Sequence, residues 1–144
     1  MSSRSRVFVD SSVIIAASIS SGGYARDLIN AGLQHEVVLI WSDLVMEETE
    51  RNLRAKAPAA VPIFQAFRQT AQIEVASADR QTTQRAEETV DPKDAPIVAA
   101  AVAGGASWIA SYDRRHLLAY RDEIQSEFGV IVATPDEIFR QLRQ

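Results

Sequence analysis

The sequence predicts an α/β protein: a three-layer α/β/α sandwich around a central parallel sheet of about four to five strands. Short apolar runs rich in β-branched residues, such as Val7-Phe-Val9 and Val37-Val-Leu-Ile-Trp41, alternate along the chain with longer helical segments. Continuous apolar runs of this kind are typical of strands buried on both faces, as strands are in parallel sheets. With 144 residues, 47% of them hydrophobic, the chain is long enough for one buried core, so we expect a single domain over residues 1–144.

The strands and helices follow from apolar periodicity. Strands are expected at 7–9, 37–41, 72–76, 107–111 and 129–132. The segment 72–76 alternates weakly between apolar and polar residues, which is typical of an edge strand. Helices are expected at 12–20, 24–31, 43–57, 61–70, 80–88, 95–103 and 114–120, followed by a last helix that ends at residue 142.

Residues with special backbone or capping properties define several of these boundaries. Gly32 is expected to end the second helix. Ser42 is a candidate N-cap for the helix 43–57, which Pro58 ends. Pro96 fits the first turn of the alanine-rich helix, and Thr134 together with its following acidic residues forms a capping box for the last one.

Composition excludes several classes of function. The chain has no cysteine, which excludes disulfides and thiolate metal sites, and its histidines are His35 and His116 alone, which excludes a histidine-rich zinc site. No apolar run approaches the roughly 20 residues of a membrane span, and the first residues do not form a signal peptide, so we expect no membrane association and a cytoplasmic location. The net charge of −4 argues against duplex binding driven by overall positive charge.

Acidic residues stand where two of the predicted strands end. Asp10 directly follows the first strand, and Asp113 follows the strand 107–111. In an open parallel sheet the carboxyl ends of the strands form the ligand crevice, so these two carboxylates are expected to lie close together. Asp94 stands at the start of the alanine-rich helix and can point into the same crevice. For Asp10 and Asp94 the alternative is a helix cap.

A fourth acid comes from the helix 43–57, which carries Glu47, Glu48 and Glu50. The interior face of this helix is expected to carry Leu44, Val45, Thr49 and Leu53. At about 100° per residue, Glu48 lies at the edge of that face and Glu47 points away from it. Glu48 is therefore the candidate for the interior; its alternative is a solvated charge on an acidic helix start.

Carboxylates gathered in one crevice repel one another, and such a cluster is useful when a cation binds to it. Because the candidate ligands are oxygens, they select hard divalent ions, Mg²⁺ or Mn²⁺. Two ions about 4 Å apart would bind the attacking and leaving oxygens of a phosphoryl displacement, with water as the nucleophile. The sequence leaves open whether one or two ions bind.

Four segments together resemble the PIN domain, the nuclease fold of VapC-type toxins. They are Phe8-Val-Asp-Ser-Ser-Val13, Ser42-Asp-Leu-Val-Met-Glu-Glu48, Asp91-Pro-Lys-Asp-Ala-Pro-Ile-Val-Ala-Ala100 and Ala110-Ser-Tyr-Asp-Arg-Arg-His-Leu-Leu118. The resemblance places the catalytic and metal-binding acids of the family on Asp10, Glu48, Asp94 and Asp113. It implies a PIN-like fold, Mg²⁺- or Mn²⁺-dependent endoribonuclease activity on RNA, a small antitoxin protein as partner, and a homodimer.

The resemblance has open points and departures. Asp91 is the neighbour that can be confused with Asp94, and Glu47 the one that can be confused with Glu48. Thr49 stands where the family more often has an aliphatic residue. His116 stands where some relatives carry another acid, and we expect it to be a packing or surface residue rather than a general base.

The same residues disfavour two other functions that use an acidic cluster in a parallel sheet. A receiver-type phosphoacceptor domain needs a lysine at a late strand end, and the lysines here, Lys56 and Lys93, are elsewhere. A haloacid-dehalogenase-type phosphatase needs an aspartate at the position of Ser12. The alternative that stands is a catalytically silent PIN-like module that binds RNA or a protein.

Overall fold

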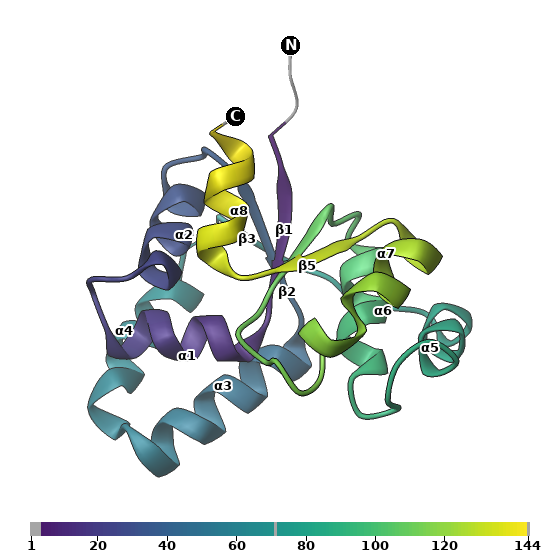
Figure 1. Cartoon of the computed structure of the whole chain (residues 1–144). Coiled ribbons are helices and arrows are strands. Elements are labelled where there is room, and N and C mark those ends of the chain that lie inside the picture. Colours follow the sequence, from purple (N-terminus) through teal and green to yellow (C-terminus); the bar gives the residue numbers. More distant parts are fainter. Residues whose placement is uncertain (1–3, 71, 144) are drawn as a thin grey trace.

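The central sheet of the protein has five parallel strands. The computed structural model describes residues 4–70 and 72–143. The strands are β1 (Arg6–Val9), β2 (Val38–Trp41), β3 (Ile73–Val75), β4 (Trp108–Ala110) and β5 (Ile131–Ala133), in the order β3-β2-β1-β4-β5 (Figure 1). In the centre, Phe8 of β1 lies opposite Ile40 of β2 and Ile109 of β4, and all three side chains are fully buried. The predicted parallel sheet is confirmed.

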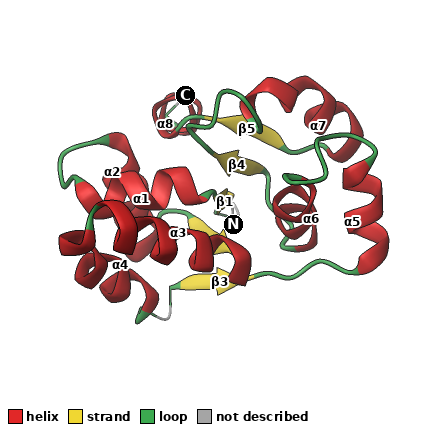
Figure 2. Ribbon diagram, turned by 90° about the horizontal axis from the view of Figure 1, so that it is seen from below, coloured by secondary structure: helices red, strands yellow, loops and turns green. Residues whose placement is uncertain are grey.

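Helices cover both faces of this sheet (Figure 2). One layer contains α1 (Ser11–Ile19), α2 (Tyr24–Leu33), α3 (Asp43–Lys56), α4 (Val61–Arg68) and α8 (Pro135–Leu142). The other contains α5 (Arg80–Glu87), α6 (Ala95–Ala103) and α7 (Arg121–Phe128). Short 3₁₀ helices, η1 (Pro58–Ala60) and η2 (Leu118–Tyr120), precede α4 and α7. The predicted three-layer α/β/α arrangement is therefore confirmed.

The strand order determines where a ligand crevice forms. From β1 the chain moves outward to β2 and β3, then returns to the far side of β1 for β4 and continues to β5. The direction of winding thus changes between β1 and β4. In doubly wound sheets the crevice lies outside the carboxyl ends of the strands at this switch point. Here those ends lead directly into Asp10 and Ser111.

Small residues let the helices lie close to the sheet. The buried face of α6 includes Ala99 and Ala101, both fully buried. Gly32 was expected to end the second helix, but α2 continues through it to Leu33. A Cβ at Gly32 would stand 2.2 Å from Cδ1 of Leu39, a fully buried residue of β2. The glycine is there because the helix touches the sheet, not because the helix stops.

Two capping predictions are confirmed. The Ser42 hydroxyl accepts a hydrogen bond of 3.3 Å from the N–H of Val45 at the start of α3. Thr134 and Glu137 form a capping box at the start of α8. Each satisfies backbone N–H groups that have no partner within their own helix.

The segment after Asp113 differs from the prediction. Instead of one helix over 114–120, the chain makes turns, the 3₁₀ helix η2 and then the helix α7, which the sequence analysis missed. The helix α7 has one buried residue, Ile124, so its apolar periodicity is weak. It ends at Gly129, whose φ of 71° is left-handed, so Gly129 belongs to the helix end and not to a strand, and β5 begins at Ile131.

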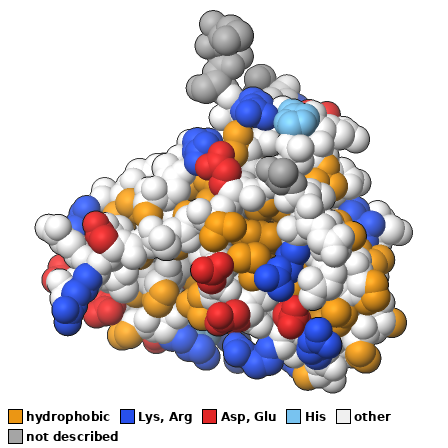
Figure 3. Space-filling view, turned by 180° about the vertical axis from the view of Figure 1, so that it is seen from behind, with side chains coloured by type: hydrophobic (Ala, Val, Ile, Leu, Met, Phe, Trp, Pro, Cys, Tyr) orange, Lys and Arg blue, Asp and Glu red, His pale blue; other side chains and the backbone are white. Residues whose placement is uncertain are grey.

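The β3 edge of the sheet faces the viewer in Figure 3, where apolar side chains gather between acidic and basic ones. Val75 of this edge strand is 58% exposed. Beside it, Glu74 pairs with Arg6 of β1 at 2.7 Å, and Arg6 also donates to the carbonyl of Gly104 at the end of α6. None of the helices in the described residues is long and apolar enough to cross a membrane.

Candidate functional site

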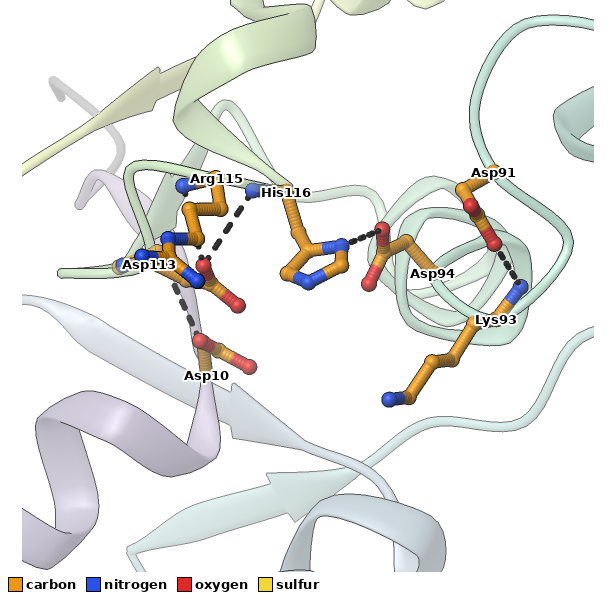
Figure 4. A network of polar contacts seen from close by, with 8 residues as sticks. Asp10, Asp91, Lys93, Asp94, Asp113, Arg115 and His116 are labelled. Carbon is orange, nitrogen blue, oxygen red and sulfur yellow. Dashed lines mark hydrogen bonds and ion pairs between the residues drawn. The ribbon is translucent and has the colours of Figure 1, made fainter.

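A cavity of about 280 Å³ lies at the carboxyl ends of β1 and β4. Its lining includes all four acids that the sequence analysis selected, Asp10, Glu48, Asp94 and Asp113. They come from four different places: the ends of β1 and β4, the helix α3 and the start of α6. Figure 4 shows Asp10, Asp113 and Asp94 around one space, with His116 between them. The fold therefore brings together residues that are distant in the sequence.

Asp10 is the most deeply buried acid of the cavity, with 4% of its surface exposed. The hydroxyls of Ser12 and Ser111 both donate to its Oδ2 atom, at 2.8 and 2.9 Å. Burial raises the pKa of Asp10; its hydrogen bonds to Ser12 and Ser111 counteract part of this, and the nearby charge of Asp113 adds to it. Asp10 occupies the N-cap position of α1, but its side chain makes no capping hydrogen bond.

Asp113 is held by the turn that follows β4. Its Oδ1 atom accepts hydrogen bonds of 3.2 Å from the N–H groups of Arg115 and His116. The N–H of Asp113 in turn donates to the hydroxyl of Ser111 at 3.0 Å. The Ser111 hydroxyl thus links the backbone of Asp113 to the carboxyl group of Asp10, at the ends of two neighbouring strands.

Glu48 reaches the cavity from α3. The hydroxyl of Ser11 donates to its Oε2 atom at 3.2 Å. Burial raises the pKa of Glu48, the Ser11 hydrogen bond opposes that change, and the charge of Asp10 adds to it. Glu47, its neighbour in sequence, is exposed and lines a different groove. Of these two residues, Glu48 is the one that lines the cavity.

The interior face of α3 is not entirely the predicted one. Val45, Thr49 and Leu53 are fully buried as expected, but Leu44 is exposed and Met46 is buried instead. Thr49 is tolerated in the interior because its hydroxyl donates to the carbonyl of Val45 at 2.8 Å. The departure from the family pattern at Thr49 therefore leaves no unsatisfied polar group.

Asp94 occupies the N-cap position of α6, but its side chain makes no capping hydrogen bond. Its Oδ2 atom lies 3.1 Å from Nδ1 of His116 instead. Burial raises the pKa of Asp94, while the charge of His116 and its hydrogen bond lower it. Asp91 is exposed, does not line the cavity, and accepts a hydrogen bond from the N–H of Lys93. Of these two aspartates, Asp94 is therefore the one that lines the cavity.

His116 and Lys93 also line the cavity, and the sequence analysis assigned neither to it. His116 was expected to be a packing or surface residue; it is partly exposed, and its ring also contacts Asp94 in the cavity. The signal was the position of His116 three residues after Asp113. There, the Asp113 carboxyl group accepts the N–H of His116 in a turn, and both residues line the cavity.

The donor set of the cavity fits a hard divalent ion. Mg²⁺ keeps several waters and binds proteins through one or two carboxylates. Burial raises the pKa of three of the acids, and repulsion between the carboxylates raises it further. The positive charge of a bound dication would favour the ionised carboxylates and so oppose both effects. In the described parts of the chain, however, no three acidic or histidine side chains stand close enough to hold one ion together. Glu48 is engaged by Ser11 and Asp94 by His116, so the carboxylates are near one another but separately held.

A larger groove, of about 690 Å³, lies along α3 and α4, away from the cavity. Its acids include Asp43, Glu47 and Glu50. Glu50 is neutralised by Arg54 and Arg68, each at 3.3 Å. The smaller cavity is the better candidate site because its acids converge from four elements, at the switch point of the sheet.

Comparisons with known proteins agree with this arrangement. The family model of the PIN domain matches residues 6–115, a span that includes all four acids. No curated protein matches the sequence.

Two solved structures share the fold. The Mycobacterium tuberculosis toxin VapC20, described as cleaving the sarcin–ricin loop, is 21% identical, with a TM-score of 0.55 over 78% of this chain and 94% of that one. The protein PAE2754 from Pyrobaculum aerophilum is 16% identical, with a TM-score of 0.63 over 97% of this chain and 91% of that one. At these identities the likeness establishes the fold, and the family match covers well over half of the sequence. The chain therefore belongs to the PIN domain family.

Proposed function

We propose that the protein is a Mg²⁺- or Mn²⁺-dependent endoribonuclease that hydrolyses RNA phosphodiester bonds through Asp10, Glu48, Asp94 and Asp113. One observation carries the proposal: these four carboxyl groups, from four separate elements, line a single cavity at the switch point of the sheet. A purely structural set of acids would be expected to pair with basic side chains or to face solvent, whereas among the described residues Asp94 alone of the four has such a partner, His116. Here, burial and mutual repulsion raise the pKa of three of them.

In the reaction, the oxygen of a water molecule forms a bond to phosphorus and the bond from phosphorus to a ribose oxygen breaks. One hydrogen of the water stays on the new phosphate oxygen, and the other ends on the leaving ribose hydroxyl. A bound dication would supply positive charge for the phosphate oxygens and lower the pKa of the attacking water.

The residues of the protein hold this arrangement in place. Ser12 and Ser111 fix the orientation of Asp10, and the turn after β4 fixes that of Asp113. Partners of this kind orient metal-binding groups and maintain their affinity. His116 orients Asp94, and Ser11 orients Glu48.

We further propose that the protein is the toxin of a toxin–antitoxin pair and forms a homodimer. The support is membership of the PIN domain family and the shared fold with VapC20, a toxin by its description. A small antitoxin encoded by a neighbouring reading frame, co-purifying with this chain and suppressing its RNA cleavage, is the expected result. Absence of such a frame, together with lack of toxicity on expression, would argue against the toxin role and leave the nuclease proposal standing.

The nuclease proposal is tested with purified protein and a mixture of RNA substrates. We expect cleavage with Mn²⁺, loss of cleavage with EDTA, and loss of cleavage in Asp10→Asn with Mn²⁺ present. Asp10→Asn retains the size of the side chain, so a folded but inactive variant separates chemistry from stability. If no ion-dependent cleavage is lost in Asp10→Asn, a catalytically silent module that binds RNA or protein is the better description.

A further inference from the structure

Lys93 is the one lysine or arginine among the described residues that line the cavity. It stands in the loop before α6, next to Asp94 in sequence. Its side chain is directed toward the space that the carboxyl groups of Asp10 and Asp94 also face (Figure 4). The cavity thus contains a positive group of the protein itself.

The backbone that carries Lys93 is held by a tight turn. The Oδ1 atom of Asp91 accepts the N–H of Lys93 at 2.9 Å. The carbonyl of Asp91 accepts the N–H groups of Asp94 and Ala95, at 2.8 and 3.1 Å. The side chain of Asp91 therefore acts outside the cavity, as a residue that fixes where the stem of Lys93 begins.

The ammonium group of Lys93 forms no ion pair with any residue that the structure describes. Its charge nevertheless reaches Glu48 across the cavity, where, together with Arg51, it lowers the pKa that burial raises. The other cavity-lining group that can carry positive charge, His116, is engaged by Asp94. The ammonium group of Lys93 is thus in the cavity and available to a ligand.

We propose that the Lys93 ammonium group contacts the scissile phosphate and takes the place of a second divalent ion, so that the cavity binds one ion. The proposal rests on the proposed nuclease function. Its geometric basis is the presence of Lys93 in a cavity of about 280 Å³ that it shares with all four carboxylates. A positive charge in the same cavity as Glu48 repels a second dication there.

In the proposed reaction Lys93 acts as a hydrogen-bond donor and not as a general acid. The ammonium group donates hydrogen bonds to the phosphate oxygens, on which negative charge grows as water attacks and the ribose oxygen leaves. Positive groups placed where charge develops stabilise the transition state more than the bound substrate. Loss of Lys93 should therefore lower kcat more than it raises KM.

The test uses the full chain with Lys93→Met, which removes the charge and retains the length of the stem. The matched control is Lys56→Met, because Lys56 is exposed at the end of α3 and does not line the cavity. Mn²⁺ binding is titrated by electron paramagnetic resonance, and cleavage of an RNA substrate is measured separately. We expect one Mn²⁺ per chain in the wild type and in Lys56→Met, and two in Lys93→Met. We expect kcat to fall about 100-fold in Lys93→Met alone.

The Mn²⁺ titration tests whether Lys93 excludes a second ion even if the protein cleaves no RNA. A wild type that binds two Mn²⁺ ions, or none, overturns the inference, and so does a Lys93→Met variant with the wild-type stoichiometry. Absence of cleavage by the wild type would count against the nuclease proposal instead. As a further check, Lys93→Arg retains the charge and should retain the one-ion stoichiometry.

Discussion

The hydroxyl of Ser111 donates a hydrogen bond of 2.9 Å to Oδ2 of Asp10, and so joins residues that are 101 positions apart in the chain. The bond connects the ends of β4 and β1, the two strands between which the winding of the sheet changes direction. It exists because parallel neighbours end on the same side of a sheet. The cavity is therefore a consequence of the topology, and its acids are placed by the strand ends and helix starts that surround it.

Asp10 should make stability depend on pH when no ion is bound. Burial raises its pKa in the folded protein, so the unfolded chain loses its proton first as pH rises. The free energy of unfolding therefore falls as pH rises from the ordinary pKa of an aspartate through the raised pKa of Asp10 in the folded protein. Asp10→Asn, which cannot ionise, should unfold about 3 °C or more above the wild type near pH 8 in EDTA, and the difference should shrink toward pH 4.

Thermal unfolding of both proteins across this pH range, in EDTA, measures the effect. Groups whose pKa is lowered in the fold, such as Glu74 and Asp136, act in the opposite direction, but they are common to both proteins and cancel in the comparison. A difference between the two melting temperatures that does not change with pH would show that ionisation of Asp10 does not destabilise the folded protein.

Glu48 and Glu47 form a matched pair on α3. Glu48→Gln retains the shape of the side chain and removes a negative charge from the cavity, so RNA cleavage should fall about 100-fold. Glu47→Gln removes the same charge from the exposed face and should leave the rate within about twofold, because surface changes of this kind have small effects. Equal losses in both variants, measured as kcat/KM, would contradict the assignment of Glu48 to the site.

His116 should support the function of Asp94 rather than act by itself. Its Nδ1 atom contacts the Asp94 carboxyl group at 3.1 Å, and loss of such a partner typically costs about tenfold or more in metal affinity. We expect His116→Asn to weaken Mn²⁺ binding by this amount, as measured by isothermal titration calorimetry. His35→Asn is the control, because His35 is exposed and does not line the cavity, and asparagine tolerates its φ of 63°. Unchanged affinity in His116→Asn would show that the contact is incidental.

The positions of the four acids could be predicted because each depends on a local signal. Asp10 and Asp113 follow apolar strands, Asp94 precedes an apolar helix, and Glu48 lies beside the interior face of α3. The topology then brings such positions together. The error at Leu44 and Met46 did not change the result, because Glu48 lies next to Val45, Thr49 and Leu53, which are buried.

The contacts of the acids could not be predicted in the same way. Whether Ser11 binds Glu48, or His116 binds Asp94, depends on loop conformation and on side-chain rotamers. The turn after β4 follows from the two hydrogen bonds that Asp113 accepts, which leave no sign in the apolar pattern. The presence of Lys93 in the cavity likewise depends on the Asp91 turn.

Gly32 tests the contact between α2 and the sheet. In Gly32→Ala the new Cβ would meet Cδ1 and Cγ of Leu39, at 2.2 and 2.4 Å, and Leu39 is too deeply buried to move away freely. We expect a loss of about 1–2 kcal/mol in the free energy of unfolding, although alanine favours a helix more than glycine does. Urea unfolding measures it. Gly22→Ala, where a Cβ meets nothing within 4 Å, should change stability little. Similar values for the two variants would contradict the close approach.

We expect one site for a hard dication among Asp10, Glu48, Asp94 and Asp113, and anomalous scattering from a crystal soaked in Mn²⁺ would locate the ion. We predict a Mn²⁺ peak in the cavity, within direct coordination distance of Asp10 and at least one of the other three acids. A cavity without a peak, in a crystal that binds Mn²⁺ elsewhere, for example beside Asp43 and Glu47 in the groove along α3, would contradict this assignment.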